Sequence, residues 1–218
     1  MGKMPMAKLR TTLSRFLIGM ACLGAATGCG GEDVALSFCE ITAASGANST
    51  AESRSNYPSG PFGIEVCDRI ENLSFTTTDE KTLSLQDIRS NPDARLLLIS
   101  TSAGWCAACI EEQPVLEDLY NTRNEKGLEV MVALFQDAVY SPASAALAQQ
   151  WTDQFELNLK VVADPAKDTG DLEFALSPYY DTNLTPMNML VDLESMTILE
   201  INVGWNIEMV SIIDAMLQ

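Results

Sequence analysis

From about residue 70 onward, short apolar runs alternate with longer segments whose apolar residues recur at helical spacing. The short runs are bounded by turn residues and predict buried strands, whereas the longer periodic segments predict helices. The expected strands are 95–101, 128–135, 159–163, 187–191 and 198–203. The expected helices are 106–124, one that opens at Ser141, and 207–217. This order predicts an α/β fold with a central mixed β-sheet flanked by helices.

Three smaller elements complete the predicted fold. Residues 72–75 and 82–85 flank a polar turn and predict an N-terminal β-hairpin. The helix that opens at Ser141 and the strand 159–163 form a central αβ insertion. Residues 171–176 suggest one short helical turn between that insertion and the last strands.

The N-terminal part differs in composition from the rest of the chain. Residues 1–15 carry four basic and no acidic side chains, and an apolar run over 16–23 precedes small residues. This pattern is typical of an export signal, which we assign to 1–28, and the run is too short for a stable membrane span. A buried amphipathic helix is the alternative. Residues 29–61, rich in small polar residues, are expected to form a flexible tether, and 62–218 the folded domain.

Net charge narrows the range of partners. All 30 acidic residues lie at or after Glu32, whereas four of the 13 basic residues lie before residue 16. Without the leader, 9 basic and 30 acidic residues remain, which gives a formal charge of −21. Such a surface repels nucleic acid and anionic lipid headgroups, so we expect no nucleic-acid partner. A solvated acidic surface that aids solubility is the simpler interpretation of this charge.

The candidate chemistry is concentrated in a Cys-x-x-Cys pair, Cys106 and Cys109, between a predicted strand and a predicted helix. At a helix N-terminus the unpaired N–H groups and the helix dipole favour a thiolate, so Cys106 is the expected nucleophile. One helical turn brings Cys109 within reach, and we assign it as the resolving thiol. Half of a structural zinc site and an inactive pair are the alternatives.

The sequence contains no histidine, which removes several other chemistries. A zinc site would need two further ligands, and the remaining cysteines form no second close pair. Ser-His-Asp hydrolysis and histidine-ligated zinc, copper or haem are excluded as well. We therefore expect no metal, and no cofactor other than the redox-active disulfide of Cys106 and Cys109.

Residues around the pair resemble the thioredoxin superfamily. Trp105 precedes the first cysteine, Pro114 lies five residues after the second, and Thr185-Pro186 follows about eighty residues later. Glu112 and the Glu-x-Pro spacing are similar to the membrane-tethered extracytoplasmic branch typified by TlpA and ResA. The similarity extends from about residue 70 to the end of the chain and implies a thioredoxin-like fold.

Two features depart from the family pattern. Ala107 and Ala108 lie between the cysteines, where glycine–proline and related pairs are usual, and Ser100 stands where cytoplasmic thioredoxins carry a buried aspartate. By resemblance, Glu112 is the buried acid that exchanges protons with the dithiol in place of that aspartate. An exposed helical glutamate is the alternative for this position.

The resemblance also implies a substrate-binding rim. Pro186 matches the family's cis-proline, which turns the backbone of Thr185 toward a partner peptide. Trp105 and Gly204-Trp205 would lie on the same face and offer an apolar docking patch. An ordinary trans turn proline and a core position for Trp205 are the alternatives.

The remaining cysteines predict an anchor and a structural disulfide. The sequence that ends in Cys29 resembles a bacterial lipobox, so Cys29 is the expected lipidation site, with plain secretion as the alternative. Loss of the leader and lipidation leave four thiols in an oxidising compartment, and by elimination Cys39 pairs with Cys67. We expect an extracytoplasmic lipoprotein of the bacterial cell envelope that faces the periplasm, in either the inner or the outer membrane.

The sequence therefore predicts a membrane-anchored thiol–disulfide oxidoreductase of the TlpA/ResA kind that acts as a monomer. Its partners would be protein disulfide substrates and a membrane thiol reductant that restores the dithiol. A peroxiredoxin-like peroxidase is one alternative, but it would need a Thr-x-x-Cys and a helper arginine near Cys106, and neither is present in the sequence. A non-catalytic surface binding module that keeps the fold is the other.

Overall fold

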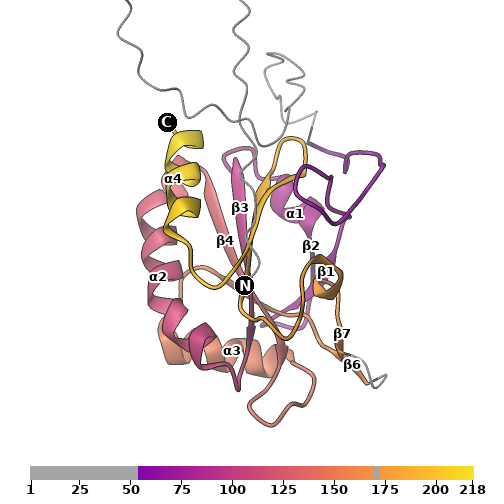
Figure 1. The fold of residues 1–218 in the computed structure, drawn as a ribbon, viewed down its shortest axis with the longest axis vertical. Coiled ribbons are helices and arrows are strands. Elements are labelled where there is room, and N and C mark those ends of the chain that lie inside the picture. Colours follow the sequence, from indigo (N-terminus) through magenta and orange to yellow (C-terminus); the bar gives the residue numbers. More distant parts are fainter. Residues whose placement is uncertain (1–53, 169–171) are drawn as a thin grey trace, which may run out of the picture. The chain divides into compact units, whose positions relative to one another are not determined.

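A central β-sheet organises the part of the chain that the computed structural model describes, residues 54–168 and 172–218 (Figure 1). In this part the sheet consists of seven strands, β1 (Ser74–Thr77), β2 (Thr82–Ser84), β3 (Leu96–Ala103), β4 (Leu128–Gln136), β5 (Lys160–Ala163), β8 (Met187–Asp192) and β9 (Thr197–Val203). They lie in the order β2-β1-β5-β4-β3-β8-β9. The pairs β3–β4 and β4–β5 are parallel and the others antiparallel, so the prediction of a mixed sheet is confirmed.

Helices cover both faces of the sheet. They are α1 (Leu85–Arg89), α2 (Ala107–Arg123), α3 (Ala145–Phe155) and α4 (Ile207–Met216), with the 3-10 turns η1 (Asn124–Lys126) and η2 (Ser177–Tyr179). α2, α3 and α4 pack against one face, and α1 and η2 against the other. Successive side chains of a strand point to opposite faces, so Leu96 and Leu98 of β3 contact the first group while Leu97 and Ile99 contact the second. A strand covered on both faces needs the continuous apolar run that the sequence shows.

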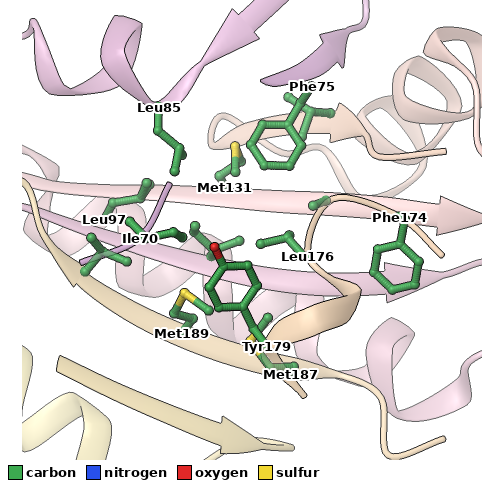
Figure 2. Packing of buried hydrophobic residues seen from close by; sticks show 14 of the residues in the cluster. Ile70, Phe75, Leu85, Leu97, Met131, Phe174, Leu176, Tyr179, Met187 and Met189 are labelled. Carbon is green, nitrogen blue, oxygen red and sulfur yellow. The ribbon is translucent and has the colours of Figure 1, made fainter. Parts of the chain in front are cut away.

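The hydrophobic cluster on the α1 side is shown in Figure 2. Ile70 and Leu85 lie above the sheet there, close to Leu97 of β3. Met131 and Met189 are fully buried in this cluster and are core residues. The flexible, unbranched side chain of methionine fills irregular gaps between larger neighbours. Packing therefore accounts for the burial of these methionines, and a metal-binding role is not needed to explain it.

α3 begins later than the sequence predicts. The predicted start, Ser141, lies in a loop, where its N–H donates to the Asp137 carboxylate at 2.8 Å. The helix starts at Ala145 because Ser144 is its N-cap, with the Ser144 hydroxyl accepting the N–H of Leu147 at 3.2 Å. Trp151 of this helix faces the core.

The helical turn predicted over 171–176 is wrong for the residues that the structure describes. Instead β6 (Lys167–Asp168) and β7 (Leu172–Glu173) form a small antiparallel ribbon. The carboxylate of Asp164 accepts the N–H groups of Ala175 and Leu176 at 2.8 and 3.0 Å. The Asp164 carboxylate thus accepts two backbone N–H groups that would otherwise donate to carbonyls within a helical turn.

The folded part includes residues 54–61, which the sequence analysis assigned to the tether. Arg54 is 5% exposed and donates to the carbonyl of Asn91 at 3.1 Å. The hydroxyl of Tyr57 donates to the carbonyl of Ile70 at 2.9 Å. The predicted boundary at residue 61 is therefore too late, because a short segment without periodicity can still be fixed by individual polar side chains.

Several predictions concern residues outside the described part. The export signal, the lipidation site Cys29 and the proposed disulfide partner Cys39 all lie there. Cys67 itself takes part in a disulfide, so its pairing with Cys39 stays a prediction. Within residues 54–168 and 172–218, no helix is long and apolar enough to cross a bilayer.

Candidate active site

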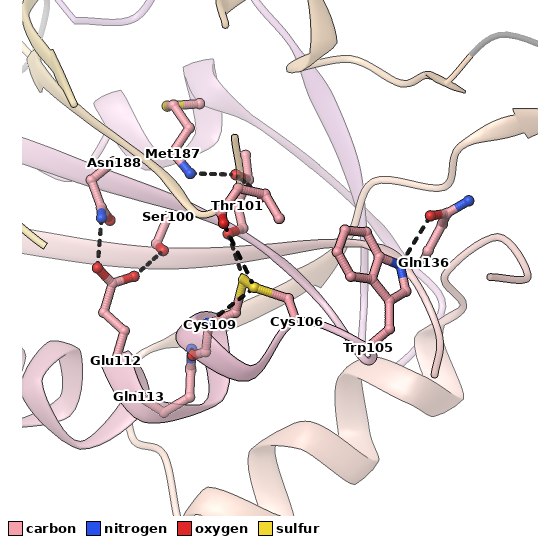
Figure 3. The surroundings of a disulfide bond; sticks show 11 residues. Ser100, Thr101, Trp105, Cys106, Cys109, Glu112, Gln113, Gln136, Met187 and Asn188 are labelled. Carbon is pink, nitrogen blue, oxygen red and sulfur yellow. Dashed lines mark hydrogen bonds between the residues drawn. A yellow bond between two sulfur atoms is a disulfide. The ribbon is translucent and has the colours of Figure 1, made fainter. Parts of the chain in front are cut away.

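The Cys-x-x-Cys pair lies where β3 ends and α2 begins (Figure 3). Cys106 and Cys109 are joined by a disulfide, and their Cα atoms are 5.3 Å apart. Cys106 is the N-cap of α2, and its Sγ accepts the N–H of Cys109 at 3.1 Å. This donor and the helix dipole favour negative charge on the Cys106 sulfur. Cys109 is fully buried and Cys106 is 5% exposed, so Cys106 is the sulfur that a substrate reaches first.

The loop that precedes β8 lies against the disulfide. The Thr185–Pro186 peptide bond is cis, and the Sγ of Cys106 lies 3.8 Å from the carbonyl oxygen of Thr185. Thr101 of β3 holds the loop, since its hydroxyl oxygen accepts the N–H of Met187 at 2.9 Å and lies 3.4 Å from that of Thr185. The structure therefore brings Thr185 and Pro186 to Cys106 and adds Thr101, which the sequence analysis did not single out.

Glu112 is buried under the sheet rather than exposed on α2 (Figure 3). Its Oε2 accepts the hydroxyl of Ser100 at 3.1 Å, and its Oε1 accepts the side-chain amide of Asn188 at 2.7 Å. Burial raises the pKa of Glu112 above its ordinary value, and the hydrogen bonds from Asn188 and Ser100 offset part of that rise. A buried carboxyl of this kind is suited to proton exchange, whereas the adjacent Glu111 is exposed.

Trp105 is fixed by a network that the sequence analysis missed. Its indole N–H donates to the side chain of Gln136 at 3.1 Å, and the Gln136 amide donates to the carbonyl of Tyr140 at 3.2 Å. The rings of Trp105 and Tyr140 stack, with centroids 5.4 Å apart, and Phe135 meets the indole edge-on. The exposed ring of Tyr140 thus extends the apolar surface of Trp105 beside the disulfide.

Gly104 allows the loop after β4 to approach the active site. A Cβ on Gly104 would lie 2.5 Å from the backbone nitrogen of Ala138 and 2.8 Å from the carbonyl carbon of Asp137. Because both atoms belong to the backbone, Gly104→Ala must displace the loop that holds Trp105. We expect a loss of about 1–3 kcal/mol in the free energy of unfolding, measured by urea denaturation.

Gly204→Ala is the matched control for that substitution. Gly204 has a φ of +73°, yet a Cβ there would meet nothing within 4 Å. Its alanine variant should lose only about 1 kcal/mol, from the left-handed backbone alone. If Gly104→Ala has the same urea midpoint of unfolding as the wild type, the loop can shift without a loss of folding free energy.

Gly204 and Trp205 lie in different surroundings. The N–H of Gly204 donates to the carbonyl of Pro186 at 2.8 Å, so Gly204 borders the cis-proline. Trp205 is half-buried and packs against the cluster under α2 and α4. The sequence left two positions open for Trp205, the docking patch and the core. Trp205 occupies the core position.

The polar residues that the sequence analysis missed share one signal. Thr101 and Asn188 are buried polar residues on the central strands β3 and β8, and Gln113 is a fully buried amide on α2. Gln113 donates to the carbonyl of Cys109 at 2.7 Å. Buried polar side chains are retained where they have a partner, so a polar residue inside an apolar run marks such a site. In the described part of the chain, no group of three acidic, cysteine or histidine side chains could hold a metal ion.

Comparisons with known proteins agree with this geometry. The model of the AhpC/TSA family matches residues 66–194, more than half of the chain. The thiol-disulfide oxidoreductase ResA of Oceanobacillus iheyensis is 28% identical over 94 residues, which make up 43% of this chain and 44% of that protein. The chain thus spans less than half the length of this relative.

Solved structures share the fold at low identity. The thioredoxin domain of a thiol-disulfide oxidoreductase from Bacteroides vulgatus is 14% identical, with a TM-score of 0.55 over 72% of this chain and 100% of that one. A thiol:disulfide interchange protein from Bacteroides sp. is also 14% identical, with a TM-score of 0.56 over 71% of this chain and 92% of that one. These similarities confirm the thioredoxin-like fold. The chain therefore belongs to the AhpC/TSA family and is a ResA-like protein of the thioredoxin superfamily.

Proposed function

We propose that the protein is a thiol–disulfide oxidoreductase that reduces protein disulfides with the dithiol of Cys106 and Cys109. The observation that carries this proposal is the setting of Cys106. Its sulfur caps α2, is bonded to Cys109 and lies 3.8 Å from the Thr185 carbonyl beside the cis-proline. The name of the Oceanobacillus iheyensis relative, a thiol-disulfide oxidoreductase, supports the same activity.

The reaction proceeds in two exchanges. The Cys106 thiolate attacks one sulfur of the substrate disulfide, whose S–S bond breaks as a mixed disulfide forms, and the leaving sulfur takes a proton. Cys109 gives its proton to Glu112 and attacks the Cys106 sulfur, so the bond between Cys106 and the substrate breaks. The second substrate sulfur leaves as a thiolate and takes up a proton from solvent, and Glu112 returns its proton to solvent. Two electrons pass from the dithiol to the substrate, and the protein ends in the disulfide form that the structure shows.

The surroundings of Cys106 favour dithiol exchange over peroxide reduction. A peroxiredoxin-like site would need a threonine three residues before the cysteine, and Ala103 occupies that position. Within residues 54–168 and 172–218, the Cys106 sulfur accepts the Cys109 N–H and lies beside the Thr185 carbonyl oxygen, and no arginine is among these neighbours.

Reduction of insulin by dithiothreitol tests the proposed activity. We expect the protein to accelerate precipitation of the insulin B chain well above the rate with dithiothreitol alone. The Cys106→Ser variant serves as the control, because it keeps the fold and lacks the attacking sulfur. A wild-type protein no faster than dithiothreitol alone would instead identify a binding module that keeps the fold without catalysis.

The proposal includes an extracytoplasmic location. The chain would be held at the membrane through lipid on Cys29, act on protein disulfides as a monomer, and be returned to the dithiol by a membrane thiol reductant. An export signal and a small-residue cleavage site before Cys29 support this location. The proposed disulfide between Cys39 and Cys67 would join the tether to the edge of the domain.

We expect lipid on Cys29. The protein should partition into detergent, and its intact mass should show acyl chains on a chain that begins at Cys29. Cys29→Ser should be released from the membrane fraction. Cys22 lies inside the apolar run, so Cys22→Ser is the matched control and should keep the lipid. Membrane retention of Cys29→Ser after processing at Gly28 would show that something else anchors the chain.

A further inference from the structure

Asn188 occupies an unusual position for an amide side chain. It lies on the central strand β8, is 1% exposed, and is surrounded in sequence by Met187 and Met189, both fully buried. Its Nδ2 donates to the Glu112 carboxylate at 2.7 Å (Figure 3). The same nitrogen donates to the carbonyl of Gly204 at 3.2 Å. One buried side chain therefore touches both the candidate proton acceptor and the rim beside the cis-proline.

Asn188 and Ser100 act on Glu112 as a pair. The two residues face each other across β3 and β8, so adjacent strands each supply one donor to one carboxylate oxygen. The Oδ1 of Asn188 has no hydrogen-bond partner in the described part of the chain. An apolar side chain at this position would avoid the free-energy cost of burying that unpaired oxygen. The advantage of asparagine here is therefore the two hydrogen bonds that its amide nitrogen donates.

Among the residues that the structure describes, hydrogen-bond donors rather than a cation balance the charge of Glu112. From β3 it is faced by Ser100 and from β8 by Asn188, neither of which titrates. On its own helix, Cys109 is held in the disulfide and does not titrate in this form, and the neighbouring Glu111 is exposed. The pKa of Glu112 is set by burial and by these two hydrogen bonds. The acids Glu200 of β9 and Glu208 of α4 lie on the other packed elements, half-exposed and exposed respectively.

We propose that Asn188 is a positioning residue for the redox centre, which holds the Glu112 carboxylate for proton exchange and ties it to Gly204 at the substrate-facing rim. The inference rests on the proposed function. The connection continues from Gly204, whose N–H donates to the carbonyl of Pro186. Loss of the Asn188 amide removes one of the two donors to the carboxylate, so Glu112 ionises at higher pH.

The test follows the carboxyl carbon resonance of Glu112 by NMR across pH, in the oxidised protein. The resonance is assigned by its absence from Glu112→Gln. Asn188→Leu should move the titration midpoint up by about one pH unit, the equivalent of one hydrogen bond to a charged group. Asn202 lies directly opposite Asn188 on β9, and its amide nitrogen has no partner in the described part, so Asn202→Leu should leave the midpoint unchanged.

A second variant and a second readout separate positioning from simple packing. Asn188→Thr suits a strand and keeps one hydroxyl donor, so its midpoint should fall between those of the wild type and Asn188→Leu. After reduction, Glu112→Gln and Glu112→Gln/Asn188→Leu should give superimposable pH profiles for alkylation of Cys106. An unchanged Glu112 midpoint in both Asn188 variants would overturn the proposal. Because neither readout needs a protein substrate, that result differs from a failure of the proposed activity, which only the insulin assay reports.

Discussion

Replacement of Cys109 by serine is expected to stop turnover and leave Cys106 in a stable mixed disulfide with its substrate. Cys109 is fully buried, and its sulfur is the one bonded to Cys106. A serine hydroxyl fits the same space but does not attack a disulfide, so the second exchange cannot occur. Insulin reduction should fall to the rate of the reductant alone, and mass spectrometry should show a substrate chain on Cys106.

The complementary variant fixes the order of the two cysteines. Cys106→Ser should be equally inactive, but it should carry no adduct, because the remaining thiol of Cys109 lies out of reach of a protein substrate. Accumulation of substrate on Cys109 in this variant would reverse the assigned roles. The two serine variants are matched in size and chemistry, so a difference between them reports position alone.

Glu112→Gln should leave the fold intact and lower insulin reduction severalfold near neutral pH. The glutamine keeps the shape of the side chain and can still accept from Asn188, while its amide donates to the Ser100 hydroxyl and no ionisable carboxyl remains. Because the titrations of the carboxyl and the dithiol are coupled, the pH profile for iodoacetamide alkylation of Cys106 should change as well. Superimposable wild-type and variant profiles would mean that proton transfer proceeds through water.

The same variant gives a signed prediction for stability. Burial raises the pKa of Glu112 in the folded state, so its contribution to stability is full below the unfolded pKa and is lost as pH rises through the folded one. The glutamine side chain of the variant cannot ionise, so Glu112→Gln should gain stability relative to wild type as pH increases. Glu111→Gln, at the exposed neighbouring position, is the control and should show little of this trend.

The sequence was sufficient for the fold and for the residues that define the redox pair. The apolar run before the cysteines had to be a strand because it was too short for a helix, and β3 is buried at all eight positions. The helical spacing of apolar residues predicted the helix after Cys106. The position of Cys106 at the N-terminus of that helix indicated that it is the more reactive cysteine. These inferences depend on local patterns that a single segment carries by itself.

The remaining features depend on contacts between distant segments. Ser141 looked like a helix start, but Asp137 binds its N–H and Ser144 supplies the cap. Asn188 and Glu112 are 76 positions apart, and nothing in either segment indicates that strand pairing brings them together. The segment around Arg54 has the composition of a linker, yet Arg54 is fixed by the carbonyls of Asn91 and Ala94, just before β3. Such contacts are determined by the assembled sheet.

The position of Arg54 has a practical consequence for attachment of the protein to other objects. Arg54 binds the carbonyls of Asn91 and Ala94, just before β3, whereas the disulfide follows the far end of that strand. Eight residues of strand separate the two points, a span of roughly 25 Å. A fusion partner, dye or solid support joined directly at Arg54 would therefore enter at the opposite end of the sheet from Cys106. Immobilised in this way, the protein should present its redox-active face to solution without obstruction.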